Sequence, residues 1–290
     1  MKWLLLIFVC CFFQAFTQKP SDFQLAKKYN ERCQIDSAYL FMRKALQKID
    51  KLNEVEQANY YTLYGRIIKL REKTDSSFLY YQKALELYER NKKPDSVLYS
   101  KILMAELFRY RGVKDMALKY IKEAEKMVTP KTPADIRAYY YNRRAAIEAM
   151  LGNNALAEKL SLKVIEMQDS ITNKETVVYS YNEYGYIYEH SNPEKSKELY
   201  LKAIELVDKH NLLIAKVDVL TLLSRLGDDI YVKLNYLEQA YELAIQLGND
   251  DMIFAVSRRL FDPYYRLGDY EKAAKYCRIA LYYQNNQSSF

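Results

Sequence analysis

The sequence predicts an all-α fold, an α-solenoid of about seven helix-turn-helix repeats, and three observations lead to it. Seven Gly and six Pro in 290 residues leave few turns for a hairpin-rich sheet protein. Apolar residues recur at three- and four-residue spacing, as in Leu79, Leu85 and Tyr88, which is typical of amphipathic helices. Small residues recur with a period of about 40 residues, and such a period indicates a repeat array.

Each repeat holds an early small residue, a turn, a small residue after the turn, and a final alanine seven residues further on. Small side chains at fixed places allow helices to approach closely. The early positions are Ala26, Gly65, Ala105, Ala145 and Gly185, and the pattern degrades at Arg225 and Phe261; the positions after the turn are Ala38, Ser77, Ala117, Ala157, Ser196, Leu237 and Ala273; the final positions are Ala45, Ala84, Ala124, Val164, Ala203, Ala244 and Ala280, spaced 39, 40, 40, 39, 41 and 36.

Turn residues lie where these helices should end. Gly112, Gly152 and Gly268 are expected to adopt a left-handed conformation after a first helix, and Asn192-Pro193 should do the same in the fifth repeat. Pro263 lies inside a first helix and should kink it. Further expected boundaries are the inter-repeat prolines Pro94, Pro130 and Pro133, and the acidic helix starts Asp228-Asp229 and Asp250-Asp251.

The repeat resembles the tetratricopeptide repeat (TPR) family. Gly65 or Gly185 stands at the family's eighth position, Ala117 or Ala273 at its twentieth, and the last repeat, LGDYEKAAKYCRIAL, is close to the consensus. The resemblance runs from Asp22 to about Tyr283 with a period of ~40 instead of 34. It implies a right-handed superhelix in which the first helices of successive repeats line the concave face.

The N-terminus is typical of a secretory signal peptide. One Lys precedes an apolar run from Trp3 to Phe13, with Ala15 and Thr17 at the cleavage positions, so residues 1–17 are predicted to be removed and the protein exported to the periplasm or beyond. An uncleaved anchor or a lipoprotein signal at Cys10 or Cys11 is the alternative. The predicted solenoid covers 18–284, followed by a polar tail, 285–290, and no further apolar stretch reaches spanning length.

The remaining composition narrows the chemistry. After cleavage the net charge is +6 and no basic block is present, so no nucleic-acid partner is expected. Cys33 and Cys277 lie at opposite ends of the chain, and in an elongated array they would stay free thiols. His190 and His210 fall near helix ends and are read as surface or capping residues. We find no phosphate loop, metal-ligand spacing or nucleophile–base pair, so the prediction is a non-catalytic protein without cofactor or metal.

The candidate site is the concave face that the TPR resemblance implies. The pairs Tyr139-x-x-Asn142 and Tyr179-x-x-Asn182 recur 40 residues apart, and such Asn amides can hold the backbone of an extended peptide while arginines take acidic groups. The alternative is that each Asn bonds a neighbouring helix and each Tyr fills the seam between repeats. The predicted protein-binding residues are Arg66, Lys69, Tyr99, Arg109, Tyr139, Asn142, Arg143, Tyr179, Asn182, Tyr186, Arg258 and Arg259, accompanied by Asn59, Glu106, Tyr110, Glu183 and Tyr265.

Three functions follow from this sequence, in order. The first is an envelope sensor or adaptor that binds a peptide or protein segment in the groove; the chain resembles the exported sensor region of bacterial TPR-containing regulators. The second is a scaffold that self-associates through its outer faces or its apolar end at Leu281, Tyr282 and Tyr283. The third and weakest is an enzyme with an unrecognised site.

Overall fold

The computed structural model describes residues 20–71 and 76–287, so the predicted signal peptide lies outside the described residues. Within them the chain forms fourteen α-helices, two short 3-10 helices and no strand, which confirms the all-α solenoid of seven helix pairs. The pairs are α2 (Asp22–Glu31) with α3 (Ile35–Leu46), α4 (Glu54–Arg71) with α5 (Ser76–Arg90), α6 (Pro94–Tyr110) with α7 (Lys114–Glu125), α8 (Ala134–Met150) with α9 (Asn154–Glu166), α10 (Lys174–Tyr188) with α11 (Pro193–His210), α12 (Leu213–Leu223) with α13 (Ile230–Leu247), and α14 (Asp250–Arg266) with α15 (Tyr270–Gln287); the 3-10 helices are Ile49–Lys51 and Gln168–Ser170.

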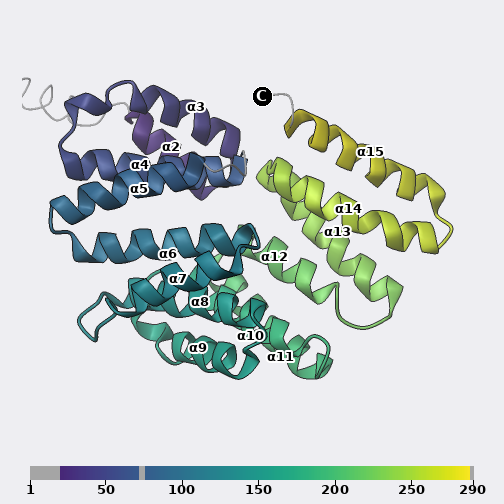
Figure 1. Cartoon of the computed structure of the whole chain (residues 1–290). Coiled ribbons are helices and arrows are strands. Elements are labelled where there is room, and N and C mark those ends of the chain that lie inside the picture. Colours follow the sequence, from purple (N-terminus) through teal and green to yellow (C-terminus); the bar gives the residue numbers. More distant parts are fainter. Residues whose placement is uncertain (1–19, 72–75, 288–290) are drawn as a thin grey trace, which may run out of the picture.

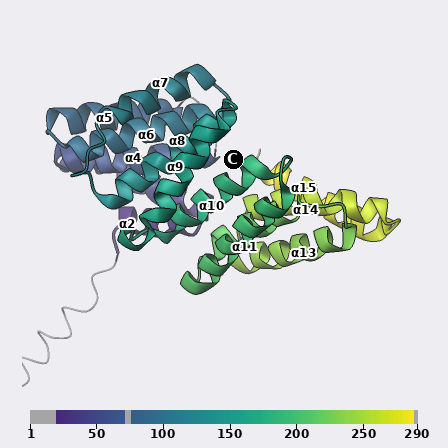
Figure 2. The same cartoon turned by 90° about the horizontal axis from the view of Figure 1, so that it is seen from below.

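The array curves because its first helices pack on one another. Each first helix packs against its own second helix and against the second helix of the preceding pair, and α2 packs on α4, α6 on α8, α8 on α10, and α10 on α12. Close first helices shorten the inner side of the array, and the second helices lie on the outside. Figures 1 and 2 show the resulting curved body, in which the last pair returns toward the first.

The small residues are buried where the repeat requires them. The alanines of the early, post-turn and final positions are all buried, from Ala26 to Ala280. Gly65 faces the ring of buried Tyr81, and a Cβ atom on Gly65 would lie 2.6 Å from Tyr81 Cε1. Gly185 meets Tyr200 in the same way at 2.4 Å. The glycine therefore leaves space for a tyrosine of the second helix, and repeats two and five share one packing solution.

Helix ends agree with the sequence except in the fifth repeat. Gly112, Gly152 and Gly268 have φ of 73°, 83° and 76°, as predicted. Asn192 instead has φ of −154° and caps the start of α11, where its side chain accepts a hydrogen bond from the backbone N–H of Lys195 at 3.1 Å. The following proline restricts Asn192 to extended backbone, so the left-handed role predicted for Asn192-Pro193 was wrong.

The sixth and seventh pairs depart from the repeat. Helix α12 ends at Leu223, so Arg225 lies beyond it and a loop through Gly227 leads to the Asp229 cap of α13. Phe261 is partly exposed instead of buried at the small position, and α14 continues through Pro263 to Arg266. The final helix extends to Gln287, into the segment expected to be a polar tail.

The two ends of the array meet. The side-chain amide of Asn249, at the start of α14, donates a hydrogen bond to the backbone oxygen of Cys33, in the turn after α2, at 3.3 Å across 216 residues. The premise of an elongated array was therefore wrong, although Cys33 and Cys277 are both free thiols. None of the helices in the described part of the chain combines the length and apolarity needed to cross a membrane.

Candidate functional site

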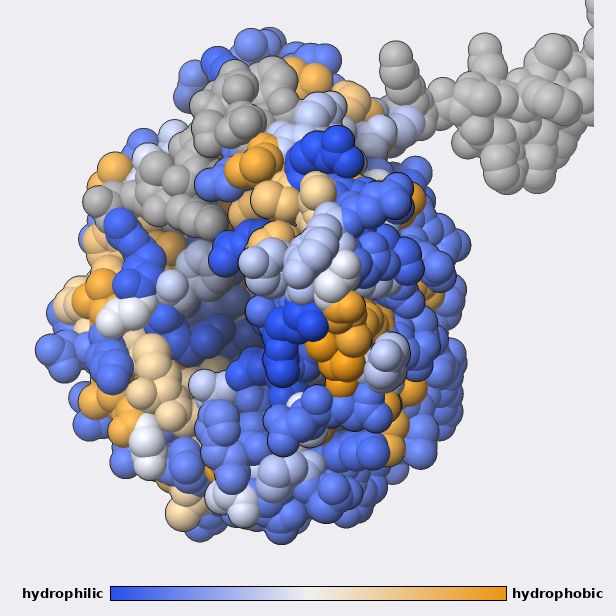
Figure 3. Space-filling model, turned by 90° about the vertical axis from the view of Figure 1, so that its right-hand side faces the viewer, coloured by the Kyte–Doolittle hydropathy of each residue, from blue (hydrophilic) through white to orange (hydrophobic). Residues whose placement is uncertain are grey.

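The curvature of the array leaves a hollow in the molecule. Figure 3 looks into this hollow and shows that mainly hydrophilic residues form its walls. Side chains of α4, α6, α8, α10 and α12 contact one another in sequence on this inner surface. The inner surface is therefore the face on which the sequence placed its candidate residues.

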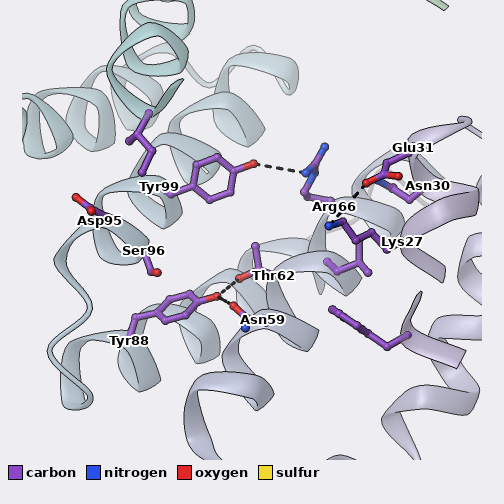
Figure 4. Close-up of a pocket in the computed structure, with 13 residues that line it drawn as sticks. Lys27, Asn30, Glu31, Asn59, Thr62, Arg66, Tyr88, Asp95, Ser96 and Tyr99 are labelled. Atoms are coloured by element: carbon purple, nitrogen blue, oxygen red, sulfur yellow. Dashed lines mark hydrogen bonds and ion pairs between the residues drawn. The ribbon is translucent and has the colours of Figure 1, made fainter. Parts of the chain in front are cut away.

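A pocket of about 540 Å³ opens on the inner surface between the first three pairs. Arg66 enters it from α4, and its guanidinium donates to the hydroxyl of Tyr99 on α6 at 3.4 Å (Figure 4). The wall opposite is held by Tyr88, whose hydroxyl donates to Asn59 Oδ1 at 2.7 Å. The complete lining is Phe23, Lys27, Asn30, Glu31, Asn59, Thr62, Leu63, Arg66, Tyr88, Asp95, Ser96, Tyr99 and Ile136.

Two polar groups of this pocket are not fully engaged. Asn30 is only 8% exposed, and its side-chain oxygen has no hydrogen-bond partner among the described residues. Arg66 is solvent-exposed and bonds only Tyr99, which leaves guanidinium N–H groups available. Lys27 and Glu31 pair loosely with each other at 3.9 Å. An acceptor oxygen and a guanidinium beside Phe23 and Leu63 can take one apolar side chain and the adjoining peptide groups.

Deeper on the inner surface, Glu106 of α6 collects three donors. Lys69 Nζ lies 3.1 Å from Glu106 Oε1, Arg143 lies 3.8 Å from the same oxygen, and the Tyr139 hydroxyl donates to Oε2 at 2.5 Å. Burial raises the pKa of Glu106, but Arg143 and Lys69 outweigh it and hold that pKa well below its usual range. Lys69 and Tyr139, both predicted to bind a ligand, are thus engaged within the protein.

Arg143 continues this chain of contacts toward α10. Its guanidinium lies 4.9 Å from the Tyr139 ring and 5.9 Å from the Tyr179 ring, and its Nε has no partner among the described residues. Tyr179 in turn donates its hydroxyl to Asp218 of α12 at 3.2 Å. Four successive first helices are thereby linked through side chains that the sequence had assigned to ligand contacts.

The carboxylates of the next repeats are poorly compensated. Burial raises the pKa of Asp218 to about 6, and Tyr179 lowers it only in part. Burial likewise raises the pKa of Glu175 despite the opposing charge of Arg66, and that of Glu183 despite Arg109 and Arg143. This part of the inner surface therefore carries negative charge that lacks a strong partner.

The two asparagines of the predicted ladder do not face the hollow. Asn142 is fully buried and donates through Nδ2 to the Ser180 hydroxyl of α10 at 3.0 Å. Asn182 is also buried, and its Oδ1 has no partner among the described residues. The position of Asn142 is that of the alternative interpretation, an amide bonding the neighbouring helix, so we leave the Asn ladder out of the candidate site.

The far end of the inner surface carries arginines and tyrosines. Arg225 donates to Glu189 at 2.6 Å and lies 5.6 Å from the ring of Tyr186, which is 48% exposed. Arg258 and Arg259 of α14 are exposed, and neither forms an ion pair within the described part of the chain. Arg225 appeared in the sequence only as a degraded repeat position, so sequence reasoning missed it.

The other residues missed are Asn30, Glu175 and Asp218. Asn30 was noted in the sequence only as an incomplete match to the TPR family's carboxylate clamp, and Glu175 and Asp218 had no signal beyond a charge on a first helix. Among the described residues, no group of His, Cys, Asp and Glu is arranged to hold a metal ion. The inner surface offers hydrogen bonds, charge and aromatic contact, which are means of binding.

Comparison with known proteins identifies the fold. No family model matches the sequence, and no curated protein matches it. A Rap protein complexed with Competence and Sporulation Factor is similar in structure, with a TM-score of 0.72 and 15% identity over 92% of this chain and 75% of that chain. The Rap conjugation gene regulator of the plasmid pLS20, in complex with the Phr* peptide, gives a TM-score of 0.72 and 13% identity over 92% and 73%.

A third similar structure carries the name of the repeat itself. It is a signal transduction ATPase with a tetratricopeptide repeat sensor from Pyrococcus horikoshii, with a TM-score of 0.54 and 23% identity over 87% of this chain and 40% of that chain. Identities this low show the fold alone. The chain has the fold of TPR-like solenoid proteins, as the repeat positions predicted.

Proposed function

We propose that this protein is a non-catalytic interaction module that binds a peptide or an extended protein segment in its hollow. The observation that carries the proposal is the pocket between α2, α4 and α6, with its volume of about 540 Å³ and its unused polar groups on Asn30 and Arg66. Buried polar atoms without partners are uncommon in proteins, and a ligand N–H would satisfy Asn30. Two solved proteins of this fold, described above, are in complex with the Phr* peptide and with Competence and Sporulation Factor.

We further propose that the binding takes place outside the cytoplasm, where the protein serves as an envelope sensor or adaptor. The signal-like residues 1–17 support this location. A partner would then be an exported or surface polypeptide.

Self-association is the second candidate, and one observation favours it. Leu281 and Tyr282 of the last helix are 51% and 62% exposed, and Tyr270 of the same helix is also exposed. A scaffold would bury this end of the array against a second copy. Sedimentation at rising concentration tests it, with Leu281→Ser as the variant that should stay monomeric.

Site-specific photocrosslinking tests the groove proposal. A benzophenone amino acid replaces Thr62 in the pocket, and a second protein carries it at Leu201, which is exposed on the outer helix α11. Both mature proteins are irradiated in envelope extract. We expect a discrete adduct from position 62 alone, lost when Arg66→Ala and Asn30→Ala are added. Equal adducts from both positions, or adducts between copies only, would replace the groove by the scaffold.

A further inference from the structure

The C-terminal end of the inner surface holds more cations than its carboxylates can neutralise. Three guanidiniums, those of Arg225, Arg258 and Arg259, lie in repeats six and seven, and Arg225 alone is paired, with Glu189. The Glu189 side chain is 4% exposed and also accepts a hydrogen bond from the Tyr200 hydroxyl at 2.7 Å. Glu189 is therefore already occupied and cannot serve the other two arginines.

Arg258 and Arg259 depend on solvent for their neutralisation. Asp262 lies one turn further along α14, yet it forms no ion pair with either arginine at 4.0 Å or less. Burial lowers the pKa of Arg259, and the neighbouring charges of Arg225 and Arg258 lower it further. Cations crowded on a partly enclosed surface favour an incoming anion, because the anion relieves their mutual repulsion.

Aromatic rings hold two of these guanidiniums in place. Arg225 lies 5.6 Å from the Tyr186 ring centroid, and Arg258 lies 5.4 Å from that of Phe254. A guanidinium stacked on a ring keeps its edge N–H groups free, and those groups match a carboxylate in a two-point contact. The exposed Tyr186 adds apolar area beside the charges.

From these contacts we infer that Arg258 and Arg259, with Arg225 and Tyr186 beside them, bind an acidic stretch of the polypeptide that occupies the hollow. This inference rests on the proposed function and adds the charge of the ligand to it. A uniform polyanion such as nucleic acid fits less well, because Glu175, Glu183 and Asp218 on α10 and α12 would repel it. A peptide can place its acidic residues at one end only.

Selection from a random dodecapeptide library displayed on phage tests the inference. The baits are the full mature protein, the Arg258→Ser, Arg259→Ser variant, and a charge-matched control with Lys197→Ser and Arg278→Ser, two exposed residues on the outer helices α11 and α15. We expect peptides rich in Asp and Glu toward one end from the mature protein and the control, and no such enrichment from the α14 variant. Circular dichroism confirms that all three baits are folded.

A synthetic copy of one enriched peptide then gives the size of the effect. Its affinity should fall at least about tenfold in the α14 variant and should weaken with salt, since two charge-assisted contacts are lost. Enriched peptides without acidic residues would overturn the inference and leave the proposed function standing. No enrichment on any bait would count against both. Tighter binding of a twelve-residue oligothymidylate than of the acidic peptide would also overturn the inference.

Discussion

The inner surface divides into two segments that share their backbone geometry and differ in how their charges are satisfied. In the paired segment, on α4, α6 and α8, Glu106 is surrounded by Lys69, Tyr139 and Arg143. In the unpaired segment, on α10, α12 and α14, Glu183 and Asp218 have raised pKa values, and Arg258 and Arg259 have no ion pair among the described residues. The paired segment contributes to holding successive repeats together, whereas the unpaired segment keeps charge available for a ligand.

This difference shows why a residue type on a concave face does not by itself indicate a binding residue. Lys69 and Arg143 were predicted from the sequence as ligand contacts on the same grounds as Arg258 and Arg259. The first two are neutralised by one carboxylate of the neighbouring helix, and the last two are not. A charge is available for binding only when the adjacent repeats leave it unneutralised.

The largest expected effect is on the paired segment. Glu106→Gln removes the charge that compensates Lys69 and Arg143, both mostly buried, and should lower the free energy of unfolding by about 2–4 kcal/mol. Glu183→Gln is the matched control on the unpaired segment, and it should change that free energy little. Urea denaturation followed by circular dichroism measures both. Equal losses in the two variants would remove the distinction between the segments.

Packing between the helices of a pair should be alike in the two segments. Gly65→Ala places a Cβ 2.6 Å from the buried Tyr81 ring and should cost about 1–2 kcal/mol of unfolding free energy, since the overpacking exceeds the helix propensity that alanine gains. Gly185→Ala, against Tyr200, should behave alike. In a Tyr81→Leu background, Gly65→Ala should lose its cost or become stabilising. A Gly65→Ala protein as stable as the parent would show that the glycine is not needed for packing.

The sequence was sufficient for the fold because packing repeats with a period. Small residues at Ala26, Ala105 and Ala145 mark the places where helices touch, and the structure buries all three. Part of the paired segment also carried a signal that sequence reasoning overlooked, since Lys69, Glu106 and Arg143 are spaced 37 residues apart in both steps. Contacts between adjacent repeats recur at about this spacing, so alternating charges at that interval predict a chain of ion pairs.

Other contacts could not be read from the sequence. The hydrogen bond from Asn249 to Cys33 spans 216 residues and depends on the curvature summed over all seven pairs. The burial of Asp218 and Glu175 depends on the same curvature, because each lies on a first helix that would be open to solvent in a straight array. A small change in rotation per repeat would move these residues far from one another, and no single repeat encodes that sum.

The unpaired segment should reveal itself through pH. A carboxyl whose folded pKa is raised binds more protons in the folded state, so its stabilising contribution increases as the pH falls. With a folded pKa of about 6 and an unfolded value near 3.9, protonation of Asp218 should raise the free energy of unfolding by about 1 kcal/mol between pH 7 and pH 5. Asp218→Asn should reduce this gain. Urea midpoints at pH 7, 6 and 5 give the comparison, and an unchanged slope in the variant would mean that Asp218 is not desolvated in solution.

The smallest expected effect concerns the point where the two ends of the array meet. Burial raises the pKa of the Cys33 thiol to about 11, with smaller contributions from Asp218, Glu175 and Asp251, so iodoacetamide at pH 8 should modify it roughly 100-fold more slowly than an unfolded control. Asn249→Ser keeps a capping oxygen at the start of α14 but is too short to reach the Cys33 backbone oxygen. In a Cys277→Ser background, it should accelerate modification several-fold. Identical rates would mean that the hydrogen bond does not hold the ends together, and that the two segments do not depend on ring closure to share one hollow.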